Sequence, residues 1–253
     1  MERIHETDAL DWLREATPPD TSVYTGFEAL GFPASTWIPH AMYENAELPG
    51  GLTHDDVRKI EVESGAVERD VIGDLDLDGM NLVLSGSGLG KSSRPGPEWR
   101  RLFWSELGDR MDIDPFAAAK HPCHRSFPFR SWPANIEPPA EGSLDVEQLF
   151  RVIQHLAVEE PRGRAAECYC WYCPLASDVD EGDGHLYRGQ LGDVFDLYLK
   201  DDVFGSPTNM WPTDQSWLVY TDYDLWATRV SGSVDLIEAL KSDPELETVD
   251  LRI

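Results

Sequence analysis

The chain is short of basic residues and has no long apolar run. It carries 21 Lys and Arg against 47 Asp and Glu, which gives a formal net charge of −26. Nucleic acids and anionic membranes present negative surfaces, so this charge argues against binding to either and favours a basic protein partner or no charged partner. No window approaches the apolar length of a membrane-spanning helix. The sequence therefore predicts a protein that binds neither nucleic acid nor membrane.

Cysteine is also scarce, and no export signal is visible. The chain has four cysteines. Its first residues mix charges, and the run from Asp8 to Leu13 is typical of the start of an amphipathic helix, not of the apolar core of a signal peptide. We therefore expect a cytoplasmic protein whose cysteines are thiols or metal ligands instead of disulfides.

Length and composition predict a folded α+β protein. The chain has 253 residues, of which 41% are hydrophobic, and this is enough for a sizeable core. With 18 Pro and 20 Gly, many turns are expected, and the aromatic-rich loops at 17–52 and 121–142 should pack on the core. We divide the chain into a mixed helical and irregular region, 1–142, and a C-terminal α+β domain, 143–253. One single compact domain is the alternative.

The first 142 residues contain three predicted helices. Residues 7–16 form one, and Thr53 begins a second with acids in its first turn, where the helix dipole favours them. Pro97 is expected to open a third, because proline suits the first helical position. Between them, residues 71–84 alternate in a way that predicts a strand or a hairpin.

The C-terminal region predicts an antiparallel sheet flanked by helices. Ser143 is expected to begin the clearest helix, where Leu149, Val152 and Leu156 repeat at helical spacing. Ser233 is expected to cap a later helix. The predicted strands are 168–173, 185–189, 216–221, 225–230 and 247–253. The chain therefore ends in a β-β-α-β unit, with the helix on one face of the sheet.

One glycine-rich segment resembles a phosphate-binding loop. Residues 85–92 end in Gly-Lys-Ser, but Ser85 stands where such a loop needs glycine, and the prolines that follow prevent an immediate helix. A flexible surface loop is one interpretation. The other is an enzyme or binding protein for an anionic small molecule or nucleotide that uses the 85–101 loop. Its anion-binding residues would be Lys91, Ser92, Arg94, Arg100 and Arg101.

The cysteines offer a weak metal hypothesis. Cys168, Cys170, Cys173 and His185 could supply three thiolates and an imidazole to zinc. In an alternating strand, however, Cys173 faces away from the other two cysteines, so we favour buried apolar cysteines and predict no cofactor. Cys123 beside His124 is adjacent in sequence only, and no Gly-x-Ser-x-Gly motif occurs. We assign no catalytic residue and favour a non-enzymatic protein.

Acidic residues gather toward the C-terminal part of the chain. They include a loop at 178–183 and a turn at 222–224, and they predict a negative surface that steers a basic protein. The predicted partner-binding residues are Asp178, Asp180, Glu181, Asp183, Asp222 and Asp224.

The last third of the chain resembles a group of uncharacterised actinobacterial proteins. The resemblance covers about residues 165–250, and most of its motifs are structural, such as corners and helix caps. It rests on the runs CYCWY (168–172), HLYRG (185–189), NMWPTDQSW (209–217), YTDYD (220–224), SGS (231–233) and DPELE (243–247). The group is similar in style to the small acidic immunity proteins of bacterial toxin systems. The resemblance implies a non-enzymatic module that neutralises a basic protein. The chain departs from the group at Cys170 and Cys173, which weakens the idea of a shared metal site.

Overall fold

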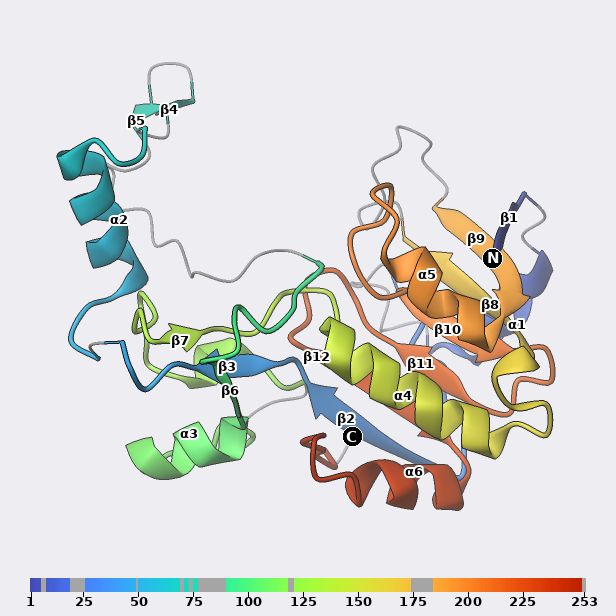
Figure 1. The fold of residues 1–253 in the computed structure, drawn as a ribbon. Coiled ribbons are helices and arrows are strands. Elements are labelled where there is room, and N and C mark those ends of the chain that lie inside the picture. Colours follow the sequence, from blue (N-terminus) through green and yellow to red (C-terminus); the bar gives the residue numbers. More distant parts are fainter. Residues whose placement is uncertain are drawn as a thin grey trace.

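The centre of the protein is a seven-stranded antiparallel sheet (Figure 1). The computed structural model describes residues 1–5, 8–18, 26–48, 50–68, 71–72, 75–76, 90–117, 121–173 and 184–251. In order across the sheet, the strands are β1 (Glu2–Ile4), β9 (His185–Gln190), β8 (Glu167–Tyr172), β10 (Asn209–Pro212), β11 (Leu218–Tyr220), β12 (Ala227–Gly232) and β2 (Ala34–Pro39). Four of these strands confirm predicted ones. Because β1 and β2 come from the first 142 residues, the sheet takes strands from both sides of the division at residue 142.

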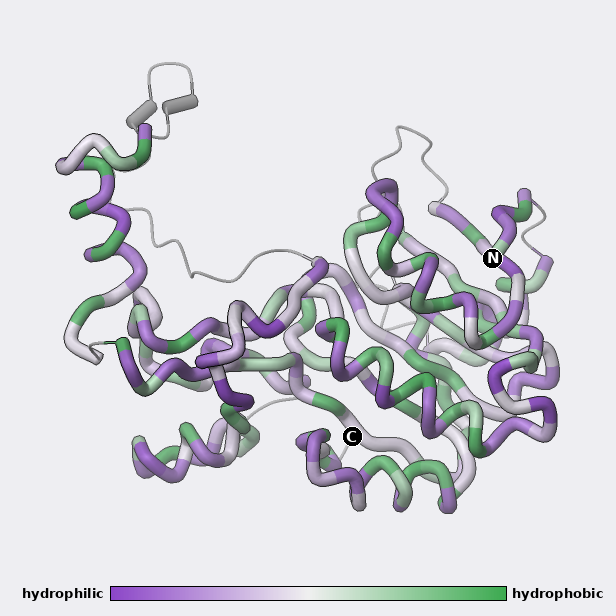
Figure 2. The backbone as a smooth tube through the Cα atoms, in the orientation of Figure 1, coloured by the Kyte–Doolittle hydropathy of each residue, from purple (hydrophilic) through white to green (hydrophobic). Residues whose placement is uncertain are grey.

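Three helices cover one face of this sheet: α4 (Val146–Glu159), α5 (Val194–Tyr198) and α6 (Val234–Lys241). The apolar stripe of α4 is fully buried, as its spacing predicts. The predicted start at Ser143 is wrong, because Asp145 caps the helix by accepting a hydrogen bond from the Gln148 amide at 2.7 Å. The Ser143 hydroxyl instead contacts the Ser206 amide. Figure 2 shows how α4 alternates between hydrophobic and hydrophilic segments.

The predicted cap of the C-terminal helix is confirmed, but the predicted strand after it is shortened to one bridge. Ser233 accepts a hydrogen bond from the Leu236 amide at 3.0 Å. Residues 247–251 form no strand of their own, and Val249 makes a single β-bridge with Trp37 of β2. The last strand of the predicted β-β-α-β unit is therefore one bridge at the edge of the sheet among the described residues.

The opposite face of the sheet is covered by N-terminal segments. The 3-10 turn η1 (Asp8–Leu10), the helix α1 (Asp11–Ala16) and residues 26–32 pack on Trp171 and Trp211. Asn209 holds the Phe27 backbone on both sides, accepting from its amide at 2.9 Å and donating to its carbonyl at 2.8 Å. The predicted packing of the 17–52 loop on the core is confirmed for residues 26–32, but the later part of that stretch is not a loop, because it forms the strands β2 and β3 (Met42–Glu44).

A smaller aromatic unit adjoins the main sheet. It contains a three-stranded sheet and the helix α3 (Trp104–Met111), in the order β6 (Arg100–Leu102), β3 (Met42–Glu44) and β7 (Ile136–Glu137). The predicted helix at Pro97 is wrong, because Leu102 pairs with Met42 as a strand and the helix begins at Trp104. Its first two amides donate to the Glu247 carboxylate, at 2.6 Å and 2.8 Å, which is a cap that local sequence does not reveal.

The helix α2 (His54–Ser64) stands away from the main sheet, and none of its residues is buried (Figure 1). Thr53 begins it through a capping box with Asp56, as predicted. The hairpin β4 (Val71–Ile72) and β5 (Leu75–Asp76) follows, and the rest of the predicted 71–84 segment lies outside the described residues. Three further short 3-10 turns lie in the described part of the chain: η3 (His124–Ser126), η4 (Gly163–Ala165) and η6 (Leu191–Asp193). No helix in the described part of the chain is long and apolar enough to cross a membrane.

Candidate functional site

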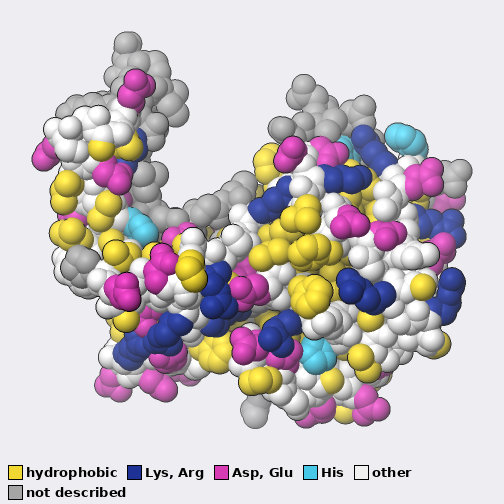
Figure 3. Space-filling view, viewed as in Figure 1, with side chains coloured by type: hydrophobic (Ala, Val, Ile, Leu, Met, Phe, Trp, Pro, Cys, Tyr) yellow, Lys and Arg dark blue, Asp and Glu magenta, His cyan; other side chains and the backbone are white. Residues whose placement is uncertain are grey.

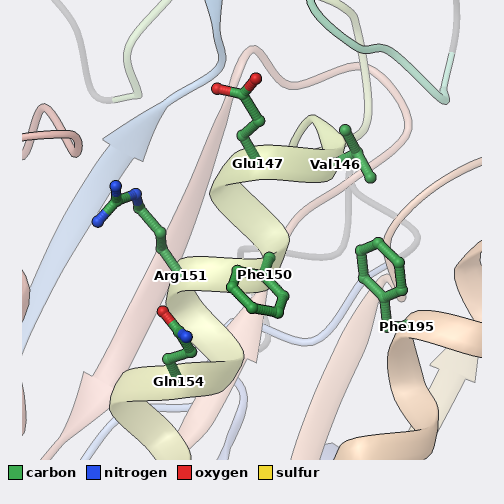
Figure 4. A pocket seen from close by; sticks show the side chains of 6 residues that line it. All are labelled: Val146, Glu147, Phe150, Arg151, Gln154 and Phe195. Atoms are coloured by element: carbon green, nitrogen blue, oxygen red, sulfur yellow. The ribbon is translucent and has the colours of Figure 1, made fainter.

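An open apolar pocket of about 370 Å³ lies between α4 and α5. Figure 4 shows Val146 and Phe150 of α4 facing Phe195 of α5, and the two phenylalanine rings lie 6.1 Å apart between centroids. Hydrophobic side chains gather on this face of the molecule in Figure 3. Val158, two turns after Phe150 on α4 and outside the pocket lining, is 86% exposed. The exposed apolar side chains of α4, beside its buried stripe, can contact an apolar side chain of another molecule.

The charged side chains beside the pocket are already paired within the chain. Glu147 and Arg94 form a bidentate ion pair with an oxygen–nitrogen distance of 2.8 Å. Arg151 contacts Asp243 at 3.1 Å. Arg164 lies over the Phe150 ring at 5.9 Å. The pocket therefore supplies apolar contacts and paired charges, which suits binding better than acid–base chemistry.

A second feature is a group of titratable and aromatic residues near the turn between β11 and β12. The Asp224 cluster consists of His124, Arg125, Glu141, Asp224 and Trp226. The His124 and Trp226 rings lie 4.1 Å apart, and the Arg125 guanidinium lies over Trp226 at 5.9 Å. One polar atom on each of three members is buried and has no hydrogen-bond partner among the described residues: His124 Nδ1, Asp224 Oδ1 and Trp226 Nε1. Such atoms are rare in folded proteins, and each one requires a physical explanation.

Gly142 brings Glu141 close to this turn. Its amide donates to the Leu225 carbonyl at 2.7 Å, and its φ of 77° lies in the left-handed region that glycine adopts without strain. A Cβ at this position would meet the Tyr223 backbone at 2.7 Å. The turn and the Glu141 segment can therefore approach this closely only with glycine at position 142.

The two acids of the Asp224 cluster are poorly compensated. Burial and the neighbouring Asp224 raise the pKa of Glu141, while Arg125 opposes this more weakly. Burial, assisted by Arg125, lowers the pKa of His124 to about 4. At neutral pH the imidazole is therefore uncharged, so Arg125 is the one positive member of the cluster beside its two acids.

The arginines of the predicted anion site are spread over separate ion pairs. Besides the Arg94 pair at the α4 pocket, Arg100 donates to Glu106 at 2.9 Å, and Arg101 contacts the buried Asp145 at 3.2 Å. Arg94 and Arg101 are brought together over the Tyr43 ring, at 5.6 Å and 5.4 Å, but each guanidinium of the three already faces a carboxylate of the chain.

The Gly-Lys-Ser residues are held by the body of the protein. The Ser92 amide donates to the Tyr198 hydroxyl at 3.2 Å, and its carbonyl accepts from the Val146 amide at 3.1 Å. The Lys91 ammonium donates to the Lys200 carbonyl. A phosphate-binding loop would direct these donors toward its ligand, whereas here they make internal contacts. Residues 85–89 of the predicted loop lie outside the described residues.

The cysteines are divided between the two faces of the main sheet. Cys168 and Cys170 are buried under the helices, whereas Cys173 belongs to the core on the opposite face, as strand alternation predicts. Burial and the neighbouring Cys168 raise the pKa of the Cys170 thiol, so it stays protonated. His185 is buried on β9, opposite Tyr172. Within the described ranges, no three His, Cys, Asp or Glu side chains form a group that could hold a metal ion.

The six predicted partner-binding residues do not form one described surface. Asp178, Asp180, Glu181 and Asp183 lie outside the described residues. Asp222 is 1% exposed, and its carboxylate accepts a hydrogen bond from the Gly26 amide at 2.6 Å, so it anchors a covering segment and offers no surface contact. Asp224 is half-buried in the cluster described above.

Sequence reasoning missed one buried charge group entirely. Glu28 receives a hydrogen bond from Arg229 at 2.7 Å and lies 3.7 Å from the His121 imidazole. The three residues are far apart in the chain, and no local pattern joins them. The α4 pocket was detectable in principle, because Val146, Phe150 and Val158 leave a second apolar stripe beside the buried one. Comparisons of the chain with protein families, with curated proteins and with solved structures found no match.

Proposed function

We propose that this chain is a non-catalytic, acidic protein-binding module of the cytoplasm that neutralises a basic protein, as immunity proteins do in bacterial toxin systems. One observation carries the proposal: acids far outnumber bases, and at least nine of the 21 bases already form ion pairs with the chain's own acids. The ion-paired bases are Arg14, Arg94, Arg100, Arg101, Arg110, Arg151, Arg188, Arg229 and Lys241. With 47 acids against 21 bases, the charge left for a partner is negative.

Two kinds of surface support binding of this type. The acids at 178–183 and at Asp224 would attract a basic protein from a distance and increase the rate of association. The apolar pocket between Phe150 and Phe195 would supply the short-range contact, because buried apolar anchors contribute most of the binding energy at protein interfaces. Among the described residues that line the pocket, there is no cysteine, serine or histidine, and binding of this kind requires no turnover.

A capture experiment tests the proposal. The immobilised protein is exposed to lysate of its source organism at low salt, washed, and eluted with rising salt, and the retained proteins are identified. We expect one basic protein, released as ionic strength rises. Retention of no basic protein would contradict the proposal.

A matched pair of charge variants sharpens this experiment. The first removes four acids of the predicted face, through Asp178→Asn, Asp180→Asn, Glu181→Gln and Asp183→Asn. The control removes four acids from the last part of the chain, through Asp235→Asn, Glu238→Gln, Glu245→Gln and Asp250→Asn. Both change the net charge equally, so a steering surface at 178–183 predicts an association rate about tenfold lower for the first variant than for the control. Equal rates would show that only net charge matters.

A further inference from the structure

The open pocket between α4 and α5 has an apolar side and a polar side. In Figure 4, Val146 and Phe150 lie toward Phe195 of α5, whereas Arg151 and Gln154 lie on the other side of Phe150. The Phe150 side chain between the two sides is 39% exposed. An elongated molecule that crosses Phe150 would therefore place one end among apolar side chains and the other end beside polar ones.

The polar side of the pocket offers hydrogen-bond donors. Arg151 uses only its Nη1 to hold Asp243, at 3.1 Å and 3.2 Å from the two carboxylate oxygens. Its Nε and Nη2 donors have no acceptor in the described part of the chain, and its side chain is 36% exposed. Gln154 is exposed one turn later on α4 and carries an amide group that can also donate. A ligand group that accepts hydrogen bonds from both residues fits this side.

The charge that is left beside the pocket is positive. Glu147, the acid in the lining, is engaged by Arg94, which donates to its two oxygens at 3.1 Å and 2.8 Å. Arg164 lies over the Phe150 ring at 5.9 Å, is exposed, and has no carboxylate partner among the described residues. On the α5 side, the exposed Asp196 would repel an anion. A negatively charged group is therefore favoured at the polar side of the pocket, away from α5.

We propose that this pocket binds a small alkyl carboxylate, such as a medium-chain fatty acid. Its alkyl chain would lie along Val146, Phe150 and Phe195, and its carboxylate would accept hydrogen bonds from Arg151 and Gln154. The pocket volume of about 370 Å³ is in the range of small-molecule sites. A second copy of the chain is disfavoured as the occupant, because it would bring a further net charge of −26 to the same face.

This site goes beyond the proposed function, because its ligand is a small molecule and its occupation needs no basic protein. A bound carboxylate would cover the apolar contact that the proposed function assigns to the partner. The ligand and the partner are therefore expected to compete for this face.

Decanoate tests the site directly. We expect saturable 1:1 binding in a calorimetric titration of the whole protein at about 0.15 M salt, where exposed charges are screened beyond about 8 Å. Decyltrimethylammonium has the same alkyl chain and the opposite charge, so it should bind at least about tenfold more weakly. Equal affinities for the two amphiphiles, or no saturation by decanoate, would overturn the carboxylate site.

A charge variant tests the polar side. Gln154→Glu places a negative charge beside Arg151, three residues earlier on α4, so decanoate affinity should fall at least about tenfold and decyltrimethylammonium affinity should rise. The control is Gln215→Glu, at an exposed residue between β10 and β11, which makes the same change in net charge. The control should bind decanoate as wild type does. An equal loss in both variants would show that net charge alone matters and would overturn the proposal.

An apolar variant tests the other side. Phe150→Ala removes apolar contact area and should weaken decanoate binding about tenfold or more. Ile60→Ala on α2 truncates another exposed apolar side chain, 53% exposed, and should leave the affinity unchanged. Melting curves establish that each variant is folded. Equal affinities of Phe150→Ala and Ile60→Ala for decanoate would place the binding elsewhere.

Sedimentation velocity tests the competing occupant. A wild-type dimer that Phe150→Ala dissociates would show that a second copy covers the pocket, and would overturn the carboxylate site. A monomer in both cases agrees with a site that is open to a small molecule.

The carboxylate site and the proposed function fail separately, because the titration uses no partner protein. If decanoate does not saturate the protein but a basic partner is captured, the carboxylate site is wrong and the proposed function stands. If decanoate binds as expected and no basic protein is retained, the carboxylate site stands and the proposed function fails.

Discussion

In two charged regions of this protein, the pKa of the glutamates is shifted in opposite directions. In the first, which we call the arginine cluster, Glu44 and Glu106 each receive hydrogen bonds from Arg100 and Arg110, with Arg110 donating to Glu44 at 2.7 Å. Those hydrogen bonds lower the pKa of both glutamates. In the Asp224 cluster, burial and a second acid raise the pKa of Glu141 instead.

This difference in pKa shows how a shortage of bases leaves some acidic side chains without a positive partner. An acid placed beside arginines is neutralised within the chain and contributes to the fold. An acid placed beside another acid costs stability and remains available to an outside cation. With so few bases, their positions decide which acids have a structural role and which are left for binding.

The largest expected effect concerns an acid that is buried and compensated. Glu28→Gln keeps the size of the side chain but leaves the buried Arg229 without its charged partner, and Glu28 is only 7% exposed at its side chain. We expect a loss of about 3–5 kcal/mol in the free energy of unfolding, measured with urea. Glu238→Gln is the exposed control and should change it by less than about 0.5 kcal/mol. A loss at Glu28 no larger than at Glu238 would remove the distinction between compensated and uncompensated acids.

The arginine cluster should give a smaller loss. Glu44 accepts hydrogen bonds from both Arg100 and Arg110, and its side chain is 12% exposed. Glu44→Gln should therefore destabilise the protein by about 1–2 kcal/mol, because charge-assisted hydrogen bonds are replaced by weaker ones near the surface. The loss should shrink as salt is added to the unfolding experiment. A loss that salt does not affect would indicate packing instead of ion pairing.

Glu141→Gln should act in the opposite direction. Since the pKa of Glu141 is raised in the folded protein, the carboxyl favours folding when protonated, and this contribution is lost as pH rises through the folded pKa. Glutamine cannot ionise, so the variant should melt at a higher temperature than wild type at pH 7. The two melting temperatures should converge below the ordinary glutamate pKa of 4.5. A variant that is less stable than wild type at pH 7 would contradict the account of the acid pair.

Nucleotides and phosphate should have the smallest effect. The basic residues near 91–101 are held in internal contacts, so ATP, GTP or phosphate should not shift the melting temperature. A genuine ligand at 100 times its Kd would stabilise the protein by about 2.7 kcal/mol. A shift that is abolished by Arg94→Gln would restore the alternative function of an anion-binding protein.

Local signals in the sequence predict much of the fold but not its long-range contacts. Ser233 and Thr53 cap helices because a hydroxyl reaches an amide three residues away, which local sequence reveals. The start of α3 depends on Glu247, more than a hundred residues from Trp104, and no local pattern contains that contact. The strand β2 was missed for a related reason, since its partner β12 comes from the other end of the chain.

In the candidate sites, too, features set by local sequence were predicted and features set by long-range contacts were not. Acid excess was predicted from composition, and the alternation of Cys168, Cys170 and Cys173 was predicted from strand geometry. Glu141 lies beside Asp224 only because Gly142 contacts the distant turn at Tyr223. The sequence therefore predicted a role for Asp224 but not for Glu141. The ion pairs that engage Arg94, Arg100 and Arg101 likewise form between residues that come together only in the folded chain.

The dependence of the association rate on ionic strength decides whether acidic residues of this chain attract its partner. The captured partner is bound to wild-type protein in a stopped-flow or surface experiment at salt concentrations from 20 mM to 500 mM. We expect the association rate to fall steeply as salt is added, by about tenfold or more, while the dissociation rate changes little. An association rate that is the same at every salt concentration would contradict recognition through uncompensated acids.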